Sequence, residues 1–433
     1  MKSSKIGWVT AGSLVVANMV GTGVFTSLGY QVVDIHNTWS IIWIWVLGMI
    51  LALCGAVSYA ELATHVKRSG GEYAFLTHVY HPLPGFLSGW VSLFVGFAAP
   101  VALAAMAFHG YTHMYTGMNG TVVAVAIILI IALIHSFSIR QSSLLQNGTT
   151  VLKVILILLL IAAGFYISPS ESALLWDDSW KPELFTSAFA VSLLYVTYSY
   201  SGWNAATYIT EEIENPGRNI PIAILGGTLF VGLIYIALNL VFLRHNPLEA
   251  LQGNLEIGQL TGTALFGQAG GRWMSVAIGV MLISSISAMT WAGPRVVQVM
   301  ARDYKALNWL RTMPGSEVPV RAIWFQAAIA CLYVLTGTFE QVLIYSGLIL
   351  QFFASLAVSA VVVIRVQASA SSDNIHQSVV FKSPLYPIPQ IVFLFVSVWF
   401  MGFLVFIRPA EVIAGLIVLA VGTAFWWFTQ RAR

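Results

Sequence analysis

Charged residues are scarce in this sequence. Asp, Glu, Lys and Arg together make up 9% of its 433 residues, whereas 58% of the residues are hydrophobic. A soluble globular protein carries about 25% charged residues. The composition therefore excludes an ordinary soluble protein and indicates a chain that lies mostly in a lipid bilayer.

Cysteine and metal-binding motifs are also scarce or missing. The two cysteines, Cys54 and Cys331, both fall in hydrophobic stretches, so the sequence predicts no disulfide and leaves the redox environment open. It contains no HExxH motif, no nucleophile paired with a base and no paired acidic residues in the hydrophobic stretches. We therefore expect no metal, no cofactor and no enzyme activity.

Long hydrophobic runs, in contrast, recur along the whole chain. About 20 apolar residues allow a helix to cross a bilayer, and twelve such runs predict an all-α polytopic membrane protein. No cleavable signal pattern precedes the first run, so we expect it to remain in the mature protein. The predicted transmembrane helices cover residues 7–33, 40–64, 83–113, 121–138, 149–167, 186–210, 221–243, 272–300, 320–338, 341–364, 388–407 and 410–429.

The basic residues predict how these helices are oriented. With the N-terminus inside, fourteen of the 20 Lys and Arg residues fall in cytoplasmic segments and only four in outer loops. Cytoplasmic loops of membrane proteins carry such an excess of Lys and Arg. We therefore expect a multi-pass protein of the cell (inner or plasma) membrane with both termini in the cytoplasm. Topology explains the net charge of +3, so no nucleic-acid partner is predicted.

The first predicted helix contains a stretch that weakens it. Residues 18–25 read NMVGTGVF, in which Gly21 and Gly23 flank Thr22. An interior glycine destabilises a helix by roughly 1 kcal/mol relative to alanine. Broken backbone in a bilayer is tolerated only where it is buried in protein or lines a cavity. The stretch therefore predicts either a break at a ligand site or close helix packing.

The sixth predicted helix contains a second such stretch, in which Ser199, Ser201, Gly202 and Asn204 crowd together. Two interrupted hydrophobic segments at corresponding positions of two halves indicate a transporter site near the bilayer midplane. Small residues that let helices approach closely are the alternative explanation. We favour the transporter site because both stretches occupy the same position in their half.

The chemistry of two such breaks favours one class of ligand. Amides that begin a second half-helix attract an anionic group, and carbonyls that end a first half-helix attract a cation. An amino acid carries a carboxylate and an ammonium on neighbouring atoms. The hydroxyl of Thr22 would add one donor for the carboxylate.

Four segments of the sequence resemble a known family. They are GTGVF at 21–25, SYAELATHVKRSGGEYAFL at 58–76, SGWNAATYITEEIENPGRNIPIAI at 201–224 and AGPRVVQVMARD at 292–303. Together they resemble the amino acid permeases of the amino acid, polyamine and organocation superfamily, and the third is most similar to the L-type amino acid transporter branch in a prokaryotic form. The resemblance implies a leucine-transporter-like fold, with inverted five-helix repeats at 1–167 and 168–366, broken helices 1 and 6, and two peripheral helices within 367–433.

The resemblance also implies roles for single residues. Thr22 and the amide of Gly23 would hold the substrate carboxylate, and the carbonyls of Met19, Tyr198 and Ser201 would face its ammonium. Tyr198 would close over the substrate as an aromatic gate, although ordinary aromatic packing is the alternative. The implied substrate-binding residues are Met19, Gly21, Thr22, Gly23, Tyr198, Ser199, Ser201 and Gly202.

Lys153 lies within the fifth predicted helix. A charge inside a transmembrane segment indicates a functional site, although a lysine near the cytoplasmic end can instead reach the membrane surface. The resemblance implies that its ammonium occupies the place where sodium-coupled relatives bind sodium. Oxygen partners would come from helices 1 and 8. The candidates in helix 8 are Ser284, Ser285 and Ser287.

Polar residues on the cytoplasmic side suggest an inner gate. We expect acidic residues after the sixth helix to pair with basic residues of other loops, although a solvated helix end is the alternative. Glu61 and Glu72 lie on either side of an SGG turn and would join this network. The other candidates are Glu211, Glu212, Glu214 and Arg218, with Lys67, Arg68 or Arg295 as partners.

These observations favour transport over other functions. An ion channel would show a pore loop or filter motif, which this sequence does not contain. We expect sodium-independent transport of neutral L-amino acids by alternating access, and the L-type similarity favours exchange. Proton-coupled uptake is the alternative if Lys153 releases its proton during the cycle.

The expected substrate and partners follow from two further segments. The stretches at 95–105 and 199–204, together with Ala288, contain no acidic residue to pair with a cationic side chain. Eukaryotic L-type transporters bind a single-span glycoprotein through a cysteine in the loop between helices 3 and 4. The corresponding loop YTGMNGT at 115–121 contains no cysteine, so we expect no disulfide-linked heavy chain.

Overall fold

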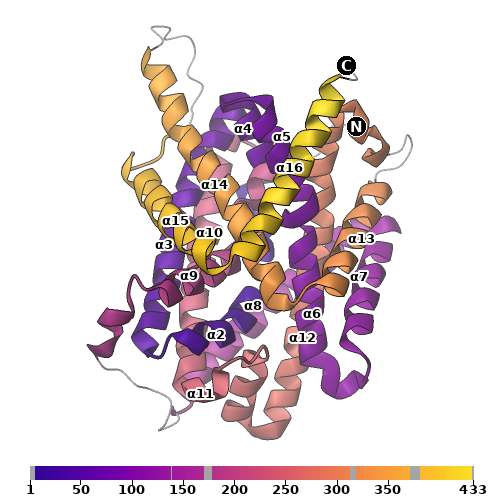
Figure 1. Cartoon of the computed structure of the whole chain (residues 1–433). Coiled ribbons are helices and arrows are strands. Elements are labelled where there is room, and N and C mark those ends of the chain that lie inside the picture. The colour runs from indigo at the N-terminus through magenta and orange to yellow at the C-terminus, as the bar shows by residue number, and fades with distance from the viewer. Residues whose placement is uncertain (1–4, 138, 170–177, 313–317, 371–380, 432–433) are drawn as a thin grey trace.

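The computed structural model describes residues 5–137, 139–169, 178–312, 318–370 and 381–431. These residues fold into a bundle of helices (Figure 1). One isolated β-bridge also pairs Ile6 with Ile213. The first half contains α1 (Trp8–Met19), α2 (Gly23–Asp34), α3 (Thr38–Val66), α4 (Glu72–Val79), α5 (Pro82–Val91), the π-helical turn η1 (Ser92–Gly96), α6 (Ala98–Thr116), α7 (Gly120–Phe137) and α8 (Ile139–Tyr166).

The remaining elements follow in chain order. They are η2 (Asp178–Glu183), α9 (Ser187–Ser199), η3 (Ala205–Glu212), α10 (Pro216–His245), α11 (Leu248–Leu251), α12 (Ile257–Asp303), η4 (Lys305–Leu310), α13 (Val320–Thr336), α14 (Phe339–Ala370), α15 (Ile388–Ile407) and α16 (Pro409–Arg431). Gly267, with φ of +71°, interrupts α12, so α12 is two helices in one continuous run.

Within the described residues, nine helical segments are long and apolar enough to cross a membrane. Three shorter apolar helices lie at the predicted fifth, sixth and ninth spans, namely Thr150–Tyr166, Ser187–Ser199 and Val320–Thr336. Every predicted range therefore overlaps one apolar helix. The total of twelve crossings and the inverted repeat stay predictions.

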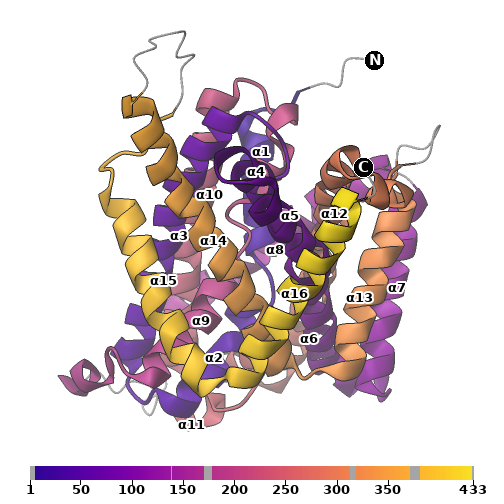
Figure 2. The same ribbon diagram turned by 45° about the horizontal axis from the view of Figure 1, so that its top comes forward.

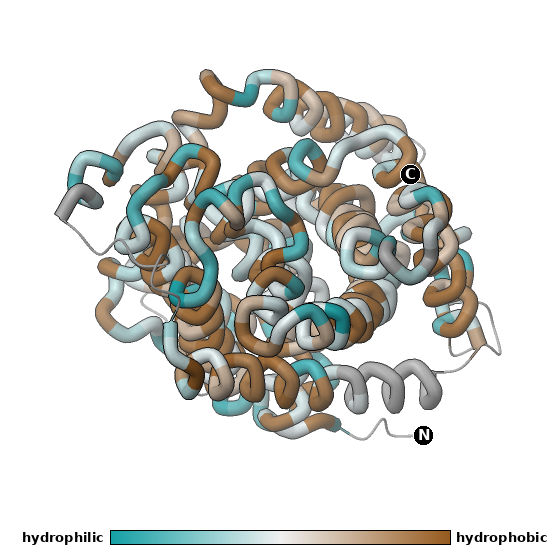
Figure 3. The backbone as a smooth tube through the Cα atoms, turned by 90° about the horizontal axis from the view of Figure 1, so that it is seen from below, coloured by the Kyte–Doolittle hydropathy of each residue, from teal (hydrophilic) through white to brown (hydrophobic). Residues whose placement is uncertain are grey.

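The core of the bundle is built from helices that pack around the two breaks. Helix α10 packs against both α1 and α3, and α6 packs against α12. Helices α15 and α16 lie at the outside of the bundle (Figure 1), and Figure 3 shows hydrophobic residues along many of the outer turns. The exposed side chains of α15 include Phe395 and Phe406, as expected for a surface that faces lipid. Helix α1 begins and α16 ends at the same end of the bundle (Figure 2).

The third predicted span contains a feature that we did not predict. Between α5 and α6, the amide of Phe97 bonds the carbonyl of Ser92 at 3.2 Å, five residues earlier. Pro100 follows within the same turn, and a proline has no amide hydrogen to bond the carbonyl four residues before it. The π-turn η1 therefore forms where Pro100 disturbs the helical ladder, and such turns are frequent at functional sites.

Candidate functional site

The first and sixth predicted helices are both broken, and their breaks touch. Residues 20–22 separate α1 from α2, and residues 200–204 separate α9 from η3. Gly202 has φ of +99°, and a Cβ atom built on it would lie 2.8 Å from the carbonyl carbon of Asn18. Only glycine fits such a left-handed position against a neighbouring backbone. The two unwound segments therefore share one contact surface.

A small pocket lies where the breaks meet. It has a volume of about 30 Å³, which is room for roughly two water molecules. Seven of the eight residues that the resemblance implied for substrate binding line this pocket, and Gly202 lines the cavity next to it. The complete lining is Asn18, Met19, Gly21, Thr22, Gly23, Pro100, Ala104, Tyr198, Ser199, Ser201, Ser285 and Met289.

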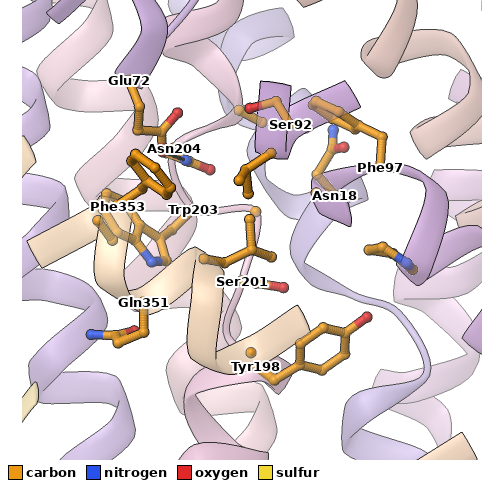
Figure 4. Close-up of a pocket in the computed structure, with 18 of the residues that line it drawn as sticks. Asn18, Glu72, Ser92, Phe97, Tyr198, Ser201, Trp203, Asn204, Gln351 and Phe353 are labelled. Atoms are coloured by element: carbon orange, nitrogen blue, oxygen red, sulfur yellow. Dashed lines mark hydrogen bonds between the residues drawn. The ribbon is translucent and has the colours of Figure 1, made fainter. Parts of the chain in front are cut away.

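A larger cavity of about 90 Å³ adjoins the small pocket on the side of α4. Figure 4 shows Tyr198 at one end of this cavity and Glu72 with Asn204 at the other. The π-turn contributes Ser92 to its wall. The residues that line both cavities are Asn18, Pro100, Tyr198, Ser201 and Met289.

The end of the pocket suited to a carboxylate lies at the start of α2. The amides of the first turn of a helix have no partner within the helix, and Thr22 stands at its N-cap without a side-chain bond to that turn. A Cβ atom on Gly21 would meet nothing closer than 3.9 Å, whereas one on Gly23 would lie 2.3 Å from Ser199 Oγ. Gly21 thus borders open space, and Gly23 is also required for α2 to pack against α9.

The opposite end of the pocket presents carbonyl groups, and one of them has a partner that we did not predict. The hydroxyl of Tyr235 on α10 donates to the Met19 carbonyl at 2.6 Å. The Tyr198 carbonyl accepts the amide of Ser201 at 2.9 Å. Tyr235 is fully buried, and a tyrosine in an apolar span was the only signal in the sequence for this contact.

Lys153 extends from α8 to the first break. Its ammonium donates to the Val20 carbonyl at 2.5 Å and to Ser285 Oγ at 3.1 Å. The side chain is only 1% exposed, so it does not reach the membrane surface. The alternative of a snorkelling lysine is therefore wrong.

The structure distinguishes among the three serines of helix 8. Ser285 contacts Lys153 and also donates to the Val20 carbonyl at 3.2 Å. Ser287 bonds His135 at 2.8 Å instead. In the described part of the chain, the buried hydroxyl of Ser284 has no hydrogen-bond partner. Of the three candidates, only Ser285 connects helix 8 to the lysine.

An aromatic cluster joins α2, α9 and α14 next to the elements that form the pocket. Tyr30 of α2 stacks on Phe339 with ring centroids 6.1 Å apart and contacts Tyr195 at 5.7 Å. The hydroxyl of Tyr195 donates to Glu340 at 2.9 Å, and Arg408 pairs with the same carboxylate at 2.6 Å. These contacts join α2, α9 and α14 to the corner between α15 and α16.

The expected pairing after the sixth helix is present in part. Arg295 lies 3.9 Å from Glu212, and Arg302, which we did not name, lies 3.9 Å from Glu211. Both acidic side chains are about half exposed, and exposed ion pairs of this kind contribute little stability.

Other members of the expected network have different partners. Arg68 pairs with Asp303 at 2.5 Å rather than with an acid after the sixth helix. Glu61 binds Arg365 through both oxygens, at 2.5 and 2.9 Å. Glu72 lines the larger cavity, so the expectation that it joins Glu61 in one network is wrong.

Comparison with known proteins identifies the family. Residues 6–428 match the family model described as amino acid permease. The chain belongs to this amino acid permease family. The match covers both breaks, Lys153 and the aromatic cluster, so the whole site lies within the part that this permease shares with its family.

Several relatives of this permease are known as transporters. It is 27% identical over 408 residues to the serine/threonine exchanger SteT of Bacillus subtilis (strain 168). This alignment covers 92% of this chain and 90% of that protein. It is 27% identical over 371 residues to the b(0,+)-type amino acid transporter 1 of Homo sapiens, covering 83% and 76%. The large neutral amino acids transporter small subunit 2 of Mus musculus is 24% identical over 380 residues, covering 83% and 70%.

Proposed function

We propose that this permease is a sodium-independent exchanger of neutral L-amino acids that works by alternating access. The observation that carries the proposal is the contact of the Lys153 ammonium with the Val20 carbonyl at 2.5 Å. The lysine ammonium already contacts a carbonyl of the broken helix 1, so no sodium ion is needed to bind it there.

The pocket at the two breaks supports an amino acid as the substrate. The first turn of α2 offers unpaired amides for a carboxylate, and the Met19 carbonyl, which has two lone pairs, keeps one beside its bond to Tyr235. The pocket itself is lined by small, apolar and hydroxyl-bearing side chains together with the amide of Asn18, and none of them is charged. These features favour a neutral amino acid whose α-groups bind the two breaks.

Alternating access would move the parts of the molecule that flank this pocket. We propose that residues 1–167 and 168–366 form the two inverted repeats and that α15 and α16 are peripheral helices. Tyr198 would act as the gate over the substrate. Tyr198 is 6% exposed and lines both cavities. Its position at the junction of the two cavities supports a gating role.

Exchange is favoured by the relative named as a serine/threonine exchanger. Proton-coupled uptake is the second candidate, in which Lys153 releases and rebinds its proton during the transport cycle. We further propose that the α4 side faces the cytoplasm, that both termini lie there, and that the protein acts in the cell membrane. It works without a disulfide-linked heavy chain, since the loop at 115–121 has no cysteine.

Uptake into liposomes that contain the purified protein tests this function. We expect uptake of labelled alanine or leucine only when the liposomes contain an unlabelled amino acid, with equal rates when sodium is replaced by choline. A requirement for sodium would refute the role of Lys153. Uptake into empty liposomes that follows an imposed proton gradient would establish the second candidate instead.

A further inference from the structure

Gln326 is a buried polar residue of α13, a helix that lines neither of the two cavities in the described structure. The residue is 3% exposed. Its Nε2 donates to the Met289 carbonyl at 3.1 Å and to the Phe97 carbonyl at 3.5 Å. The first bond has an ordinary length and the second is long. One amide therefore connects α13 both to α12 and to the junction of the π-turn η1 with α6.

The two residues whose carbonyls meet this amide belong to the wall of the site. Met289 lines both cavities, and Phe97 lines the larger one. The ring of Phe97 also contacts Tyr208 of η3, with ring centroids 5.5 Å apart, and Tyr208 lines the same cavity. Gln326 thus acts on the cavity wall through the backbone of Met289 and Phe97, without lining the cavity itself.

The π-turn leaves the backbone around Phe97 short of donors. Pro100 has no amide hydrogen, so it cannot bond the Gly96 carbonyl. The amide of Val101 reaches the Phe97 carbonyl only at 3.4 Å. A buried carbonyl without a good donor destabilises the backbone that carries it. The amide of Gln326 supplies a further donor at this carbonyl and so favours the turn in the form that the structure shows.

Gly293 of α12 leaves the space that this contact needs. A Cβ atom built on it would lie 2.3 Å from Gln326 Oε1 and 2.8 Å from the Cβ of Phe97. Both distances are shorter than a van der Waals contact, so a larger residue would push the amide and the turn away from α12. Because α12, α13 and the π-turn pack this closely, a change in one of them shifts the others.

The position of this contact relates it to the substrate. The small pocket has a volume of about 30 Å³, which is too little for a whole amino acid. The substrate side chain therefore extends into the larger cavity. Met289 lies where the two cavities join, since it lines both of them. The wall that Gln326 holds is thus the wall that borders the side chain of the substrate.

We propose that Gln326 is a positioning residue that determines which lengths of substrate side chain the permease accepts, because it fixes the π-turn and Met289 relative to each other. The inference rests on the proposed function, since it concerns the side-chain end of the same site. A fixed apolar wall can discriminate strongly, as one methylene group changes specificity by about 10- to 200-fold. A wall that loses its anchor discriminates less.

Gln326→Met tests this role, because methionine keeps the length of the side chain and removes the donor. In liposomes with the full-length protein, we measure KM and kcat for alanine, norvaline and norleucine, which differ only in the length of an unbranched side chain. We expect the wild-type KM to differ along this series. The variant should move the ratio of the KM for norleucine to that for alanine toward one by about threefold or more, with similar kcat values.

Gln390→Met is the matched control. Gln390 is fully buried on α15, and its Nε2 donates to the hydroxyls of Ser58 and Ser383 at 3.0 Å each. None of these three residues lines either cavity. The control therefore removes a buried amide of the same kind at a distance from the wall, and it should leave the KM ratio unchanged.

Gly293→Ala reaches the same contact from α12 and keeps the test open if Gln326→Met does not fold. Its Cβ displaces the amide and the turn, so it should also change the KM ratio by about threefold or more. Gly226 of α10 has nothing within 4 Å of an added Cβ. Gly226→Ala is therefore the matched control and should leave the ratio as it is.

The outcomes separate this inference from the proposed function. An unchanged KM ratio in Gln326→Met or Gly293→Ala, with or without a lower kcat, would assign Gln326 to ordinary packing and refute its positioning role. A wild type with one KM for all three substrates would also refute that role and leave the amino acid transporter intact. A wild type that transports no amino acid would refute the proposed function itself.

Discussion

The two helix breaks are kept open in different ways. At the first break, side chains from other helices bind the freed carbonyls. Tyr235 of α10 bonds the Met19 carbonyl at 2.6 Å, and Lys153 of α8 bonds the Val20 carbonyl at 2.5 Å. Both partners are at least 130 residues away in the sequence. The first break therefore depends on how the bundle is assembled.

The second break satisfies more of its own backbone. The amide of Ser201 bonds the Tyr198 carbonyl at 2.9 Å, and the amide of Ala205 bonds the Gly202 carbonyl at 3.0 Å. These turns need only local residues and the positive φ of Gly202. The comparison teaches that one break is set by tertiary contacts and the other by local sequence. Substitutions should affect them differently.

Gly202→Ala should have the largest effect, because it acts on both breaks. An alanine at this φ is strained by about 1–2 kcal/mol, and its Cβ would also overlap the backbone of Asn18. We expect a loss of more than about 2 kcal/mol of stability, measured as thermal unfolding in detergent. Gly253, with φ of +68° and nothing within 4 Å of its Cβ, gives the matched control Gly253→Ala. Equal effects of the two variants would mean that the contact between the breaks is unimportant.

Lys153→Ala should come next and should act on the first break alone. It leaves the Val20 carbonyl without its charged donor, which costs about 1.5–3 kcal/mol and corresponds to about a ten- to hundredfold loss of transport. The fold should survive, because the loss falls on one conformation more than on the whole protein. Transport assays in liposomes with and without sodium check this. Wild-type rates in the variant would exclude Lys153 from the mechanism.

Tyr235→Phe should have a smaller effect at the same break. It removes only the hydroxyl from the Met19 carbonyl, a neutral bond worth about 0.5–1.5 kcal/mol, while the ring contacts with Trp45 and Tyr200 remain. We expect up to about a tenfold weaker apparent affinity for substrate with little change in melting temperature. A variant that melts much earlier but transports normally would show that Tyr235 serves packing alone.

Ser285→Ala should have the smallest effect of the four. The lysine keeps its bond to the Val20 carbonyl and loses only the hydroxyl at 3.1 Å. We expect a few-fold reduction in transport rate. The neighbouring Ser284→Ala is the matched control, since that hydroxyl is buried without a partner in the described structure and its removal should leave transport unchanged. A larger defect in Ser284→Ala would reverse the assignment.

Much of the site was predictable because it depends on unusual local sequence. Clustered small residues mark both breaks, and a lysine within a hydrophobic run marks the proposed cation position. Ser285 could not be chosen over Ser284 or Ser287, because the choice depends on how α12 is rotated against α8 and α1.

The missed residues share one physical cause. Tyr235 is one of 16 tyrosines, and nothing local to it distinguishes its contact with a carbonyl more than 200 residues away. Glu72 directly follows the SGG turn, which the sequence places in a cytoplasmic loop. Only the packing of α4 against η3 brings its side chain beside the larger cavity. The local sequence around a residue does not predict its contacts with elements that are distant in the chain.

The close approach of α2 and α9 limits how this family can diversify. A Cβ on Gly23 would lie 2.6 Å from the Cα of Ser199, so two backbones form that wall of the pocket and no side chain can replace them without moving a helix. The opposite wall is made of the side chains of Ala104 and Met289. A change in the shape of this pocket is therefore open to side chains such as those on α6 and α12, while the wall made by the two backbones stays as it is.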